Sequence, residues 1–314
     1  MASLVAGQSA IDDIHITPRE KPVDVASAAF AAPYAGGSII RSNVDLVLVP
    51  VTITDDLNRP VLGLRAQNFE LFENKHRQEI RNLSSEDTPV SVGILVDTSR
   101  SMSYKLDRAR EAVQQFCEIA NPEDEFFLIT FANEPQLASD FTTHSENIEN
   151  ALLTVRSNGQ TSLLDAIYMG LQKMHGARYG RKALLIVSDG GDNHSRYTEH
   201  DVKSAIRESD VTLYAIGTFE RWANTQEELL GPDLLRSLAQ STGGVAFTLD
   251  NPNQMPAVGR NISDRLRHQY VLAYEPELRP HDGKWHKISV KLRLPKKFAF
   301  LRVNARPGYY AAEE

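Results

Sequence analysis

The pattern of hydrophobic and polar positions changes twice along the chain. Residues 44–53 form an almost continuous run of aliphatic and β-branched side chains, which predicts a strand. Residues 69–72 and 78–83 carry strand-like patterns on either side of a polar turn at 73–75, which predicts a hairpin. The first region, residues 41–86, is therefore expected to be a small all-β piece that forms half of a β-sandwich.

A different pattern begins at Pro89. Short apolar segments, typical of buried strands, alternate with segments in which apolar residues recur at helical spacing. The expected strands are 90–96, 125–131, 183–187, 211–216 and 245–249, and the expected helices are 103–120, 145–155, 162–174, 199–208, 233–241 and 255–266. Apolar strands between amphipathic helices predict a parallel sheet covered on both faces. Residues 89–266 are therefore expected to form a doubly wound, mostly parallel α/β domain.

The strand pattern returns after this domain. Residues 270–274 and 298–303 are expected strands, and in 284–294 apolar and polar residues alternate as in a half-exposed antiparallel strand. The most economical arrangement pairs 268–311 with 41–86 in one small antiparallel β-sandwich. The α/β domain is then inserted between the two halves of that sandwich.

The N-terminal segment differs from all three regions. Residues 1–40 show neither helical nor strand periodicity and are rich in alanine, glycine and proline, which predicts a flexible segment. The first ten residues fit either the remnant of an export signal or a plain tail. The localisation therefore stays open, with secretion or the periplasm favoured over the cytoplasm. No run of about 18 apolar residues occurs, so no transmembrane helix is expected.

Charge and cysteine content exclude two classes of function. The 314 residues include 41 acidic and 34 basic ones, with a formal net charge of −7. Nucleic acid is therefore not expected as a partner, because phosphate binding needs a basic surface. The single cysteine, Cys117, excludes an intrachain disulfide framework and any CxxC metal or redox motif. We expect it to pack in the core.

Candidate chemistry begins directly after the strand at 90–96. Asp97 is followed by Ser99 and Ser101, which gives one carboxylate and two hydroxyl groups in one turn. In an open α/β sheet, ligands bind beyond the carboxyl ends of the strands. Hard oxygen donors suit Mg²⁺, Mn²⁺ or Ca²⁺ rather than zinc or copper. Alone, this pattern is weak, because aspartate and serine are also ordinary turn and cap residues.

Two further residues fall at the same edge of the expected sheet. Thr161 opens a helix after a short polar loop, and Asp189 follows the strand at 183–187. Two carboxylates that face one pocket repel each other unless a cation lies between them. The alternative is that each acid merely caps the helix that follows it. Taken together, the segments predict a divalent metal site formed by Asp97, Ser99, Ser101, Thr161 and Asp189.

The order of these five residues resembles the metal-ion-dependent adhesion site of von Willebrand factor type A domains, which reads Asp-x-Ser-x-Ser, then Thr, then Asp. Residues 48–52, 68–72 and 307–309 are also similar to segments of a bacterial subfamily of von Willebrand A-related proteins. The resemblance covers roughly residues 41–310. The strand–insert–strand layout is similar to that of integrin β chains, in which an A-type domain is inserted into another domain.

The resemblance implies a role for each residue. Ser99 and Ser101 would ligate the metal directly, Asp97 and Asp189 directly or through water, and Thr161 would join or leave with the conformational state. A free coordination position would take a carboxylate from a partner protein. The implied function is a metal-dependent protein-binding or adhesion module without catalysis. The sequence leaves the partner and the oligomeric state open.

A metal-dependent phosphohydrolase of the haloacid dehalogenase type is the alternative function. Such an enzyme also has an aspartate after its first strand, and Asp97 would be its nucleophile. That chemistry needs a second carboxylate two residues later, where this sequence has Ser99. Motifs of the forms GxxxxGK[ST], GxGxxG and GxSxG do not occur, so nucleotide-binding and serine-hydrolase functions lack their motifs.

Overall fold

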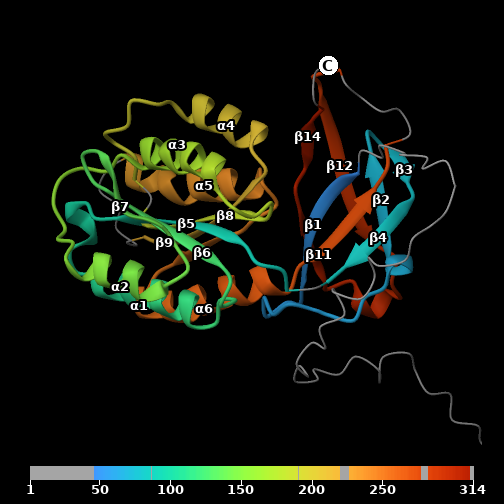
Figure 1. Ribbon diagram of the computed structural model, residues 1–314, viewed down its shortest axis with the longest axis horizontal. Coiled ribbons are helices and arrows are strands. Elements are labelled where there is room, and N and C mark those ends of the chain that lie inside the picture. The colour runs from blue at the N-terminus through green and yellow to red at the C-terminus, as the bar shows by residue number, and fades with distance from the viewer. Residues whose placement is uncertain (1–45, 86, 190, 220–225, 277–281, 312–314) are drawn as a thin grey trace, which may run out of the picture. The chain divides into compact units, whose positions relative to one another are not determined.

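The structure, a computed structural model, describes residues 46–85, 87–189, 191–219, 226–276 and 282–311 (Figure 1). The flexible segment predicted at 1–40 lies outside the described residues. The described strands form one six-stranded and two four-stranded sheets. In these parts of the chain, no helix is long and apolar enough to span a membrane.

The six-stranded sheet is mostly parallel. Its strands are β5 (Ser91–Asp97), β6 (Glu125–Phe131), β7 (Pro135–Thr142), β8 (Lys182–Ser188), β9 (Val211–Thr218) and β10 (Ala246–Leu249). They are arranged in the order β10-β9-β8-β5-β6-β7, and only the pair β6–β7 is antiparallel. The first strand, β5, therefore lies inside the sheet, next to β6 and β8. The chain reverses its order across the sheet at β5, which is where such folds present ligands.

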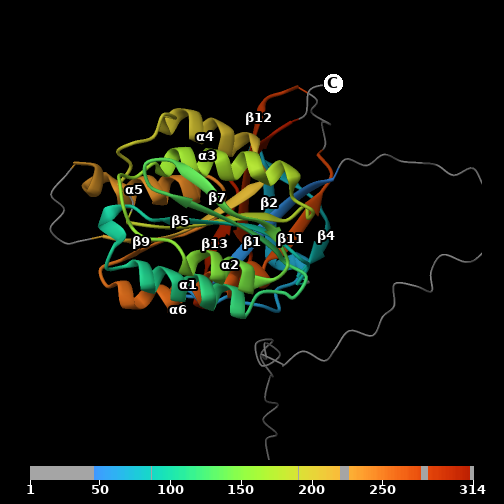
Figure 2. The same cartoon turned by 60° about the vertical axis from the view of Figure 1, so that its left-hand side comes forward.

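Helices cover both faces of this sheet. They are α1 (Leu106–Glu118), α2 (Ser145–Leu153), α3 (Leu163–Lys173), α4 (Glu199–Glu208), α5 (Gln226–Gln240) and α6 (Met255–Arg267). Figures 1 and 2 show α1, α2 and α6 on one face and α3, α4 and α5 on the other. The prediction of a doubly wound, mostly parallel α/β fold is confirmed.

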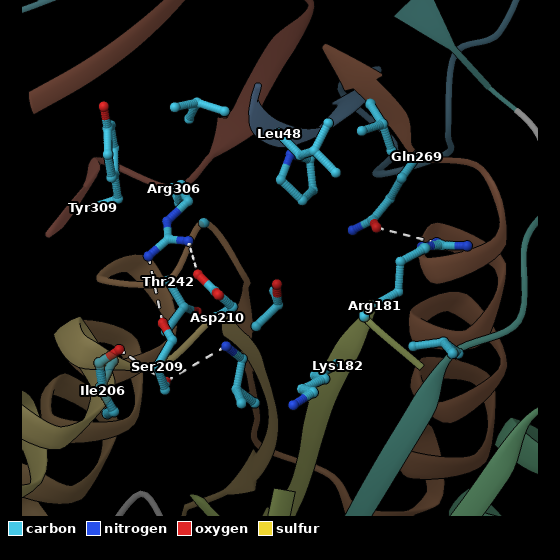
Figure 3. A pocket seen from close by; sticks show the side chains of 18 of the residues that line it. Leu48, Arg181, Lys182, Ile206, Ser209, Asp210, Thr242, Gln269, Arg306 and Tyr309 are labelled. Carbon is cyan, nitrogen blue, oxygen red and sulfur yellow. Dashed lines mark hydrogen bonds and ion pairs between the residues drawn. The ribbon is translucent and has the colours of Figure 1, made fainter. Parts of the chain in front are cut away.

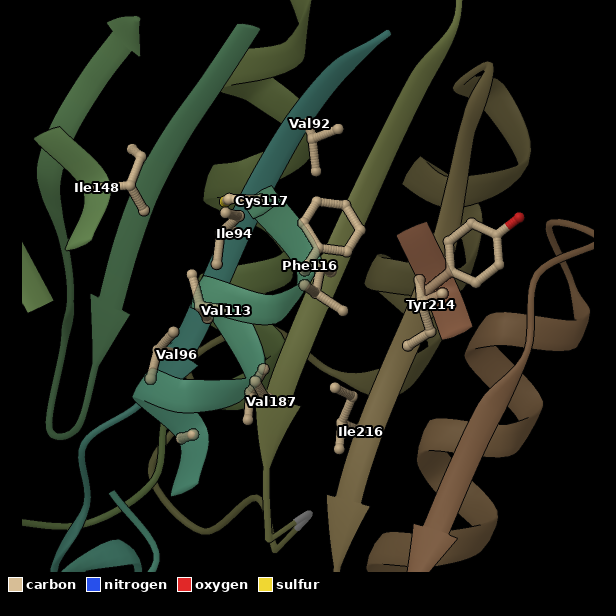
Figure 4. Close-up of a cluster of buried hydrophobic side chains, with 14 of the residues drawn as sticks. Val92, Ile94, Val96, Val113, Phe116, Cys117, Ile148, Val187, Tyr214 and Ile216 are labelled. Carbon is tan, nitrogen blue, oxygen red and sulfur yellow. The ribbon is translucent and has the colours of Figure 1, made fainter. Parts of the chain in front are cut away.

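Burial on both faces explains why the middle of the central strand, residues 92–96, is apolar. All seven residues of β5 are buried. Ile94 and Val96 pack with Val113 and Phe116 of α1 in the cluster shown in Figure 4. Gly93 faces the other way, where an added Cβ would lie 2.2 Å from the ring of Phe127. Since the middle of β5 is apolar, its polar residues are the ones at its two ends, Ser91 and Asp97.

The two four-stranded sheets are antiparallel and draw strands from both sides of the α/β region. Their strands are β1 (Val47–Thr54), β2 (Phe69–Glu73), β3 (His76–Gln78), β4 (Ile80–Ser84), β11 (Tyr270–Tyr274), β12 (Trp285–Leu292), β13 (Arg302–Ala305) and β14 (Gly308–Tyr310). The orders are β13-β1-β11-β4 and β14-β12-β2-β3. One apolar cluster joins residues of both sheets. The insertion of the α/β fold between two sandwich halves is confirmed, and the boundaries at 41–86, 89–266 and 268–311 stay predictions.

The predicted hairpin is correct only in its first part. β2 pairs with β3 through a turn in which Asn74 and Lys75 have positive φ angles of 47° and 72°. The chain then leaves this sheet, and β4 pairs with β11 in the other one. The predicted partner segment 78–83 thus spans two strands in different sheets.

Two other expectations differ from the structure. The predicted strand at 298–303 begins later, as β13, because the chain after Pro295 first forms a 3₁₀ turn at Lys296–Phe298. β7 was not predicted at all. None of its eight residues is buried, so it lacks the apolar pattern by which a strand is recognised.

Candidate metal centre

The loop that follows β5 holds a carboxylate and two hydroxyl groups in one turn. Asp97 is the last residue of β5 and has 0% of its surface exposed. Its Oδ1 accepts the backbone N–H of Ser99 at 2.8 Å, and its Oδ2 accepts the hydroxyl of Ser188 at 2.6 Å. The Oγ atoms of Ser99 and Ser101 lie 3.0 Å apart. Three of the five predicted ligands are therefore held next to one another.

The loop that carries Thr161 is bonded to this first loop through the backbone. The N–H of Asn158 donates to the carbonyl of Thr98 at 2.8 Å, and the N–H of Arg100 donates to the carbonyl of Gly159 at 3.1 Å. Gly159 has a φ of +87°, a conformation that glycine adopts without strain. These bonds fix the approach to Thr161, which is buried. The fourth predicted ligand thus lies on a loop that is tied to the first three.

The segment after β8 is bonded to both other loops. Ser188 ends β8 and donates to Asp97, which places the next residue, Asp189, at the same strand end. Further along, Asn193 Oδ1 accepts the N–H of Thr161 at 2.9 Å. The N–H groups of Asn193 and His194 both donate to the carbonyl of Thr161. All three segments predicted from the sequence therefore meet at the carboxyl edge of the sheet.

The two carboxylates of this edge interact electrostatically. Burial and, next in importance, the negative charge of Asp189 raise the pKa of Asp97 to about 7. Asp189 Oδ2 lies 3.1 Å from the Nζ atom of Lys105, and both side chains are largely buried. One ammonium group therefore faces two carboxylates. When both carboxylates are ionised, one negative charge is left without a counter-ion, and this charge would attract a cation.

The chemistry of these donors fits a divalent hard cation. Carboxylate and hydroxyl oxygens are ligands for Mg²⁺, Mn²⁺ or Ca²⁺, whereas zinc and copper prefer nitrogen or sulfur. No cluster of three or more His, Cys, Asp and Glu side chains suited to a metal occurs among the described residues. A site here must consequently use the hydroxyl groups as well as the two carboxylates. The assignment of the five ligands stays a prediction.

Three neighbouring residues were given no definite role by the sequence. Asp192 Oδ1 accepts the N–H of Leu164 and the hydroxyl of Ser195, so it stabilises the start of α3. Ser188 orients Asp97, and Lys105 pairs with Asp189. A lysine just before a helix is unusual, because the positive end of the helix dipole disfavours a cation there. That position was the available signal for Lys105.

The protein has a mostly parallel α/β sheet, inserted between antiparallel strands, with oxygen donors at its carboxyl edge. Comparison with known protein families shows which of them this region resembles. Residues 92–191 match the family model of the von Willebrand factor type A domain, and all five predicted ligands fall within this range. No curated protein matches the chain in sequence.

One solved structure of such a domain shares the fold, and two further structures are less similar. A von Willebrand factor type A protein from Catenulispora acidiphila has a TM-score of 0.51 and 14% sequence identity, over 86% of this chain and 74% of that chain. The von Willebrand factor domain of a type V pilus tip protein from Porphyromonas gingivalis has a TM-score of 0.46 and 14% identity, over 56% of this chain and 94% of that chain. Proximal thread matrix protein 1 from the mussel byssus has a TM-score of 0.49 and 15% identity, over 62% and 51%. The first of these three supports the von Willebrand A-type fold.

Proposed function

We propose that this chain is a protein-binding module that holds a divalent cation, Mg²⁺ or alternatively Mn²⁺ or Ca²⁺, and has no catalytic activity. The cation would bind at the carboxyl edge of the parallel sheet and take a carboxylate from a partner protein. The observation that carries this proposal is the buried Asp97 carboxylate, which interacts with Asp189 beside the hydroxyl groups of Ser99 and Ser101.

Each proposed ligand has support from its surroundings. The hydroxyls of Ser99, Ser101 and Thr161 and the carboxylates of Asp97 and Asp189 would hold the ion. When bound, the ion would act as a Lewis acid that attracts a carboxylate oxygen. The protein contributes a fixed geometry, because Asp97 belongs to a buried strand and accepts two hydrogen bonds. Sites on rigid elements bind with little loss of conformational entropy.

The phosphohydrolase alternative gains no support. Ser99 stands where that chemistry requires a second carboxylate, and its hydroxyl interacts with that of Ser101. The match of residues 92–191 to the von Willebrand factor type A model favours a binding role over this alternative.

Titration calorimetry with Mn²⁺ and Mg²⁺ tests the metal site directly. We expect dissociation constants in the micromolar to millimolar range, roughly as for exposed sites with few charges. Asp97→Ala and Ser99→Ala should each weaken binding about tenfold or more, since each removes an oxygen donor. Ser103→Ala is the matched control, because Ser103 is exposed and lies outside the proposed ligand set. Absence of both heat and thermal stabilisation with either ion would reject the site.

Partner binding requires a second experiment. The wild-type chain and Asp97→Ala are immobilised, and capture from the native source is compared with Mg²⁺ and with a chelator. We expect one set of proteins that is retained only by the wild type and only with metal. Equal capture by Asp97→Ala would reject the adhesion mechanism. Turnover of a generic phosphate ester that Asp97→Ala lacks would instead favour the phosphohydrolase.

A further inference from the structure

A buried lysine lies against the proposed metal centre. Lys105 directly precedes α1 and is only 3% exposed. Its Nζ atom lies 3.1 Å from Asp189 Oδ2 and 5.0 Å from the centre of the Tyr104 ring. No role in metal binding follows from its side chain, because an ammonium group is a donor only and cannot ligate a cation. Its position beside a proposed ligand therefore requires another explanation.

We propose that Lys105 is a built-in counter-ion of the metal site, whose ammonium group holds Asp189 in the metal-free protein and competes with the divalent cation for it. This inference rests on the proposed function. When both are ionised, Asp97 and Asp189 bring two negative charges, and Lys105 returns one positive charge. A divalent ion therefore enters a site whose attraction for cations is already reduced.

Burial makes this competition effective. The side chains of Lys105 and Asp189 are 4% and 11% exposed, so solvent and salt screen their attraction poorly. The Lys105 ammonium group donates to Asp189 Oδ2 at 3.1 Å, and a hydrogen bond between two charged groups is stronger than one between neutral groups. In an exposed pair the same charges would contribute almost nothing.

Local helix preferences do not explain a lysine here. Lys105 is the N-cap residue of α1, and its side chain makes no capping hydrogen bond. Serine, threonine, aspartate or asparagine would cap the helix and suit its dipole. Its ammonium group instead pairs with Asp189, on a segment 84 positions away. Its place is therefore explained by the site and not by the helix.

Replacement of the lysine should tighten metal binding. In Lys105→Met, we expect the dissociation constant for Mn²⁺ to fall about tenfold, since a neighbouring positive charge no longer opposes the ion. Lys105→Arg, which keeps the charge, should bind Mn²⁺ like the wild type. Lys182→Met is the matched control. Lys182 is a half-buried lysine at the opposite end of β8, where its Nζ donates to the carbonyl of Met174.

Thermal unfolding supplies a readout that is independent of affinity. In a chelator, Lys105→Met leaves two carboxylates without a counter-ion, and its melting temperature should fall by about 5 °C or more. Saturating Mn²⁺ should remove most of this difference, because the ion then balances both charges. For Lys182→Met, any difference from the wild type should be the same with and without Mn²⁺.

The possible results separate the inference from the proposed function. Equal or weaker Mn²⁺ binding by Lys105→Met would overturn the competition and leave the metal site standing. No binding by either protein would overturn the metal site, and the inference with it. If Lys105→Met does not fold, Lys105→Gln gives the same comparison, because its amide can still donate to Asp189 but carries no charge.

Discussion

The two ends of the parallel sheet hold their buried charges in different ways. At the amino end, the Arg181 guanidinium donates to the carbonyl oxygens of Thr88 and Leu266 and to Oε1 of Gln269. These residues belong to the segments that enter and leave the α/β region. Both terminal nitrogens of this guanidinium are thus paired with acceptors. Its role is to join segments of the chain.

The carboxyl end has more negative charge than its surroundings balance. Asp97 and Asp189 interact with each other, and Lys105 pairs with only the second of them. Buried groups with perturbed pKa values are candidates for function, because an unbalanced buried charge costs stability. The difference between the two ends therefore makes the carboxyl end the candidate functional site.

The amino end of the sheet also holds a cavity. Its volume is about 730 Å³, and it lies between the starts of the parallel strands and β1 (Figure 3). Two of the cations that line it are already paired within the protein, since Arg306 donates to Asp210 at 2.6 Å and Arg181 to Gln269 at 3.2 Å.

The largest effect on stability is expected at the amino end. Arg181→Met leaves the carbonyl oxygens of Thr88 and Leu266 without their donor, and should lower the free energy of unfolding by about 3 kcal/mol. Denaturant titration measures this loss, which should be the same with Mn²⁺ and with a chelator. Arg178→Met is the control, because Arg178 is exposed, and should change stability by less than about 0.5 kcal/mol. If Mn²⁺ restored the stability that Arg181→Met loses, Arg181 would depend on the metal site, and the two ends of the sheet would not differ in this respect.

A pH effect of intermediate size should come from Asp124, also at the amino end. Burial is the main cause that raises the pKa of Asp124 to about 6, although its carboxylate accepts the N–H groups of Val90 and Asn121. A pKa that is higher in the folded state adds stability below the unfolded value, and this is lost as the pH rises through about 6. Relative to Asp124→Asn, the wild type should therefore gain about 2 kcal/mol between pH 7.5 and 4.5. If the free energies of unfolding of the two proteins changed equally with pH over this range, the raised pKa of Asp124 would be contradicted.

Sequence patterns predicted those features of the fold that depend on local periodicity. The buried strands and the helices were recognisable because apolar residues repeat along them, and three polar loops were expected at one edge because parallel strands share a direction. β7 escaped prediction because an exposed edge strand has no such repeat. The pairing of Lys105 with Asp189 escaped because it joins positions 84 residues apart. No local rule connects those two residues, and only the folded chain brings them together.

The smallest predicted effect is at the carboxyl end, and it has the opposite sign to the loss of stability expected for Arg181→Met. Asp97→Asn keeps the shape of the side chain but removes the buried charge that Asp189 opposes. In a chelator at pH 8, we expect the free energy of unfolding to rise by about 1 kcal/mol, whereas Mn²⁺ binding is lost. Near pH 6 the gain should vanish, since the wild-type carboxyl, with a pKa of about 7, is then itself protonated. Denaturant titrations at the two pH values measure both effects. A less stable Asp97→Asn at pH 8 would mean that this carboxylate is a structural charge like Arg181, and that the two ends of the sheet do not differ.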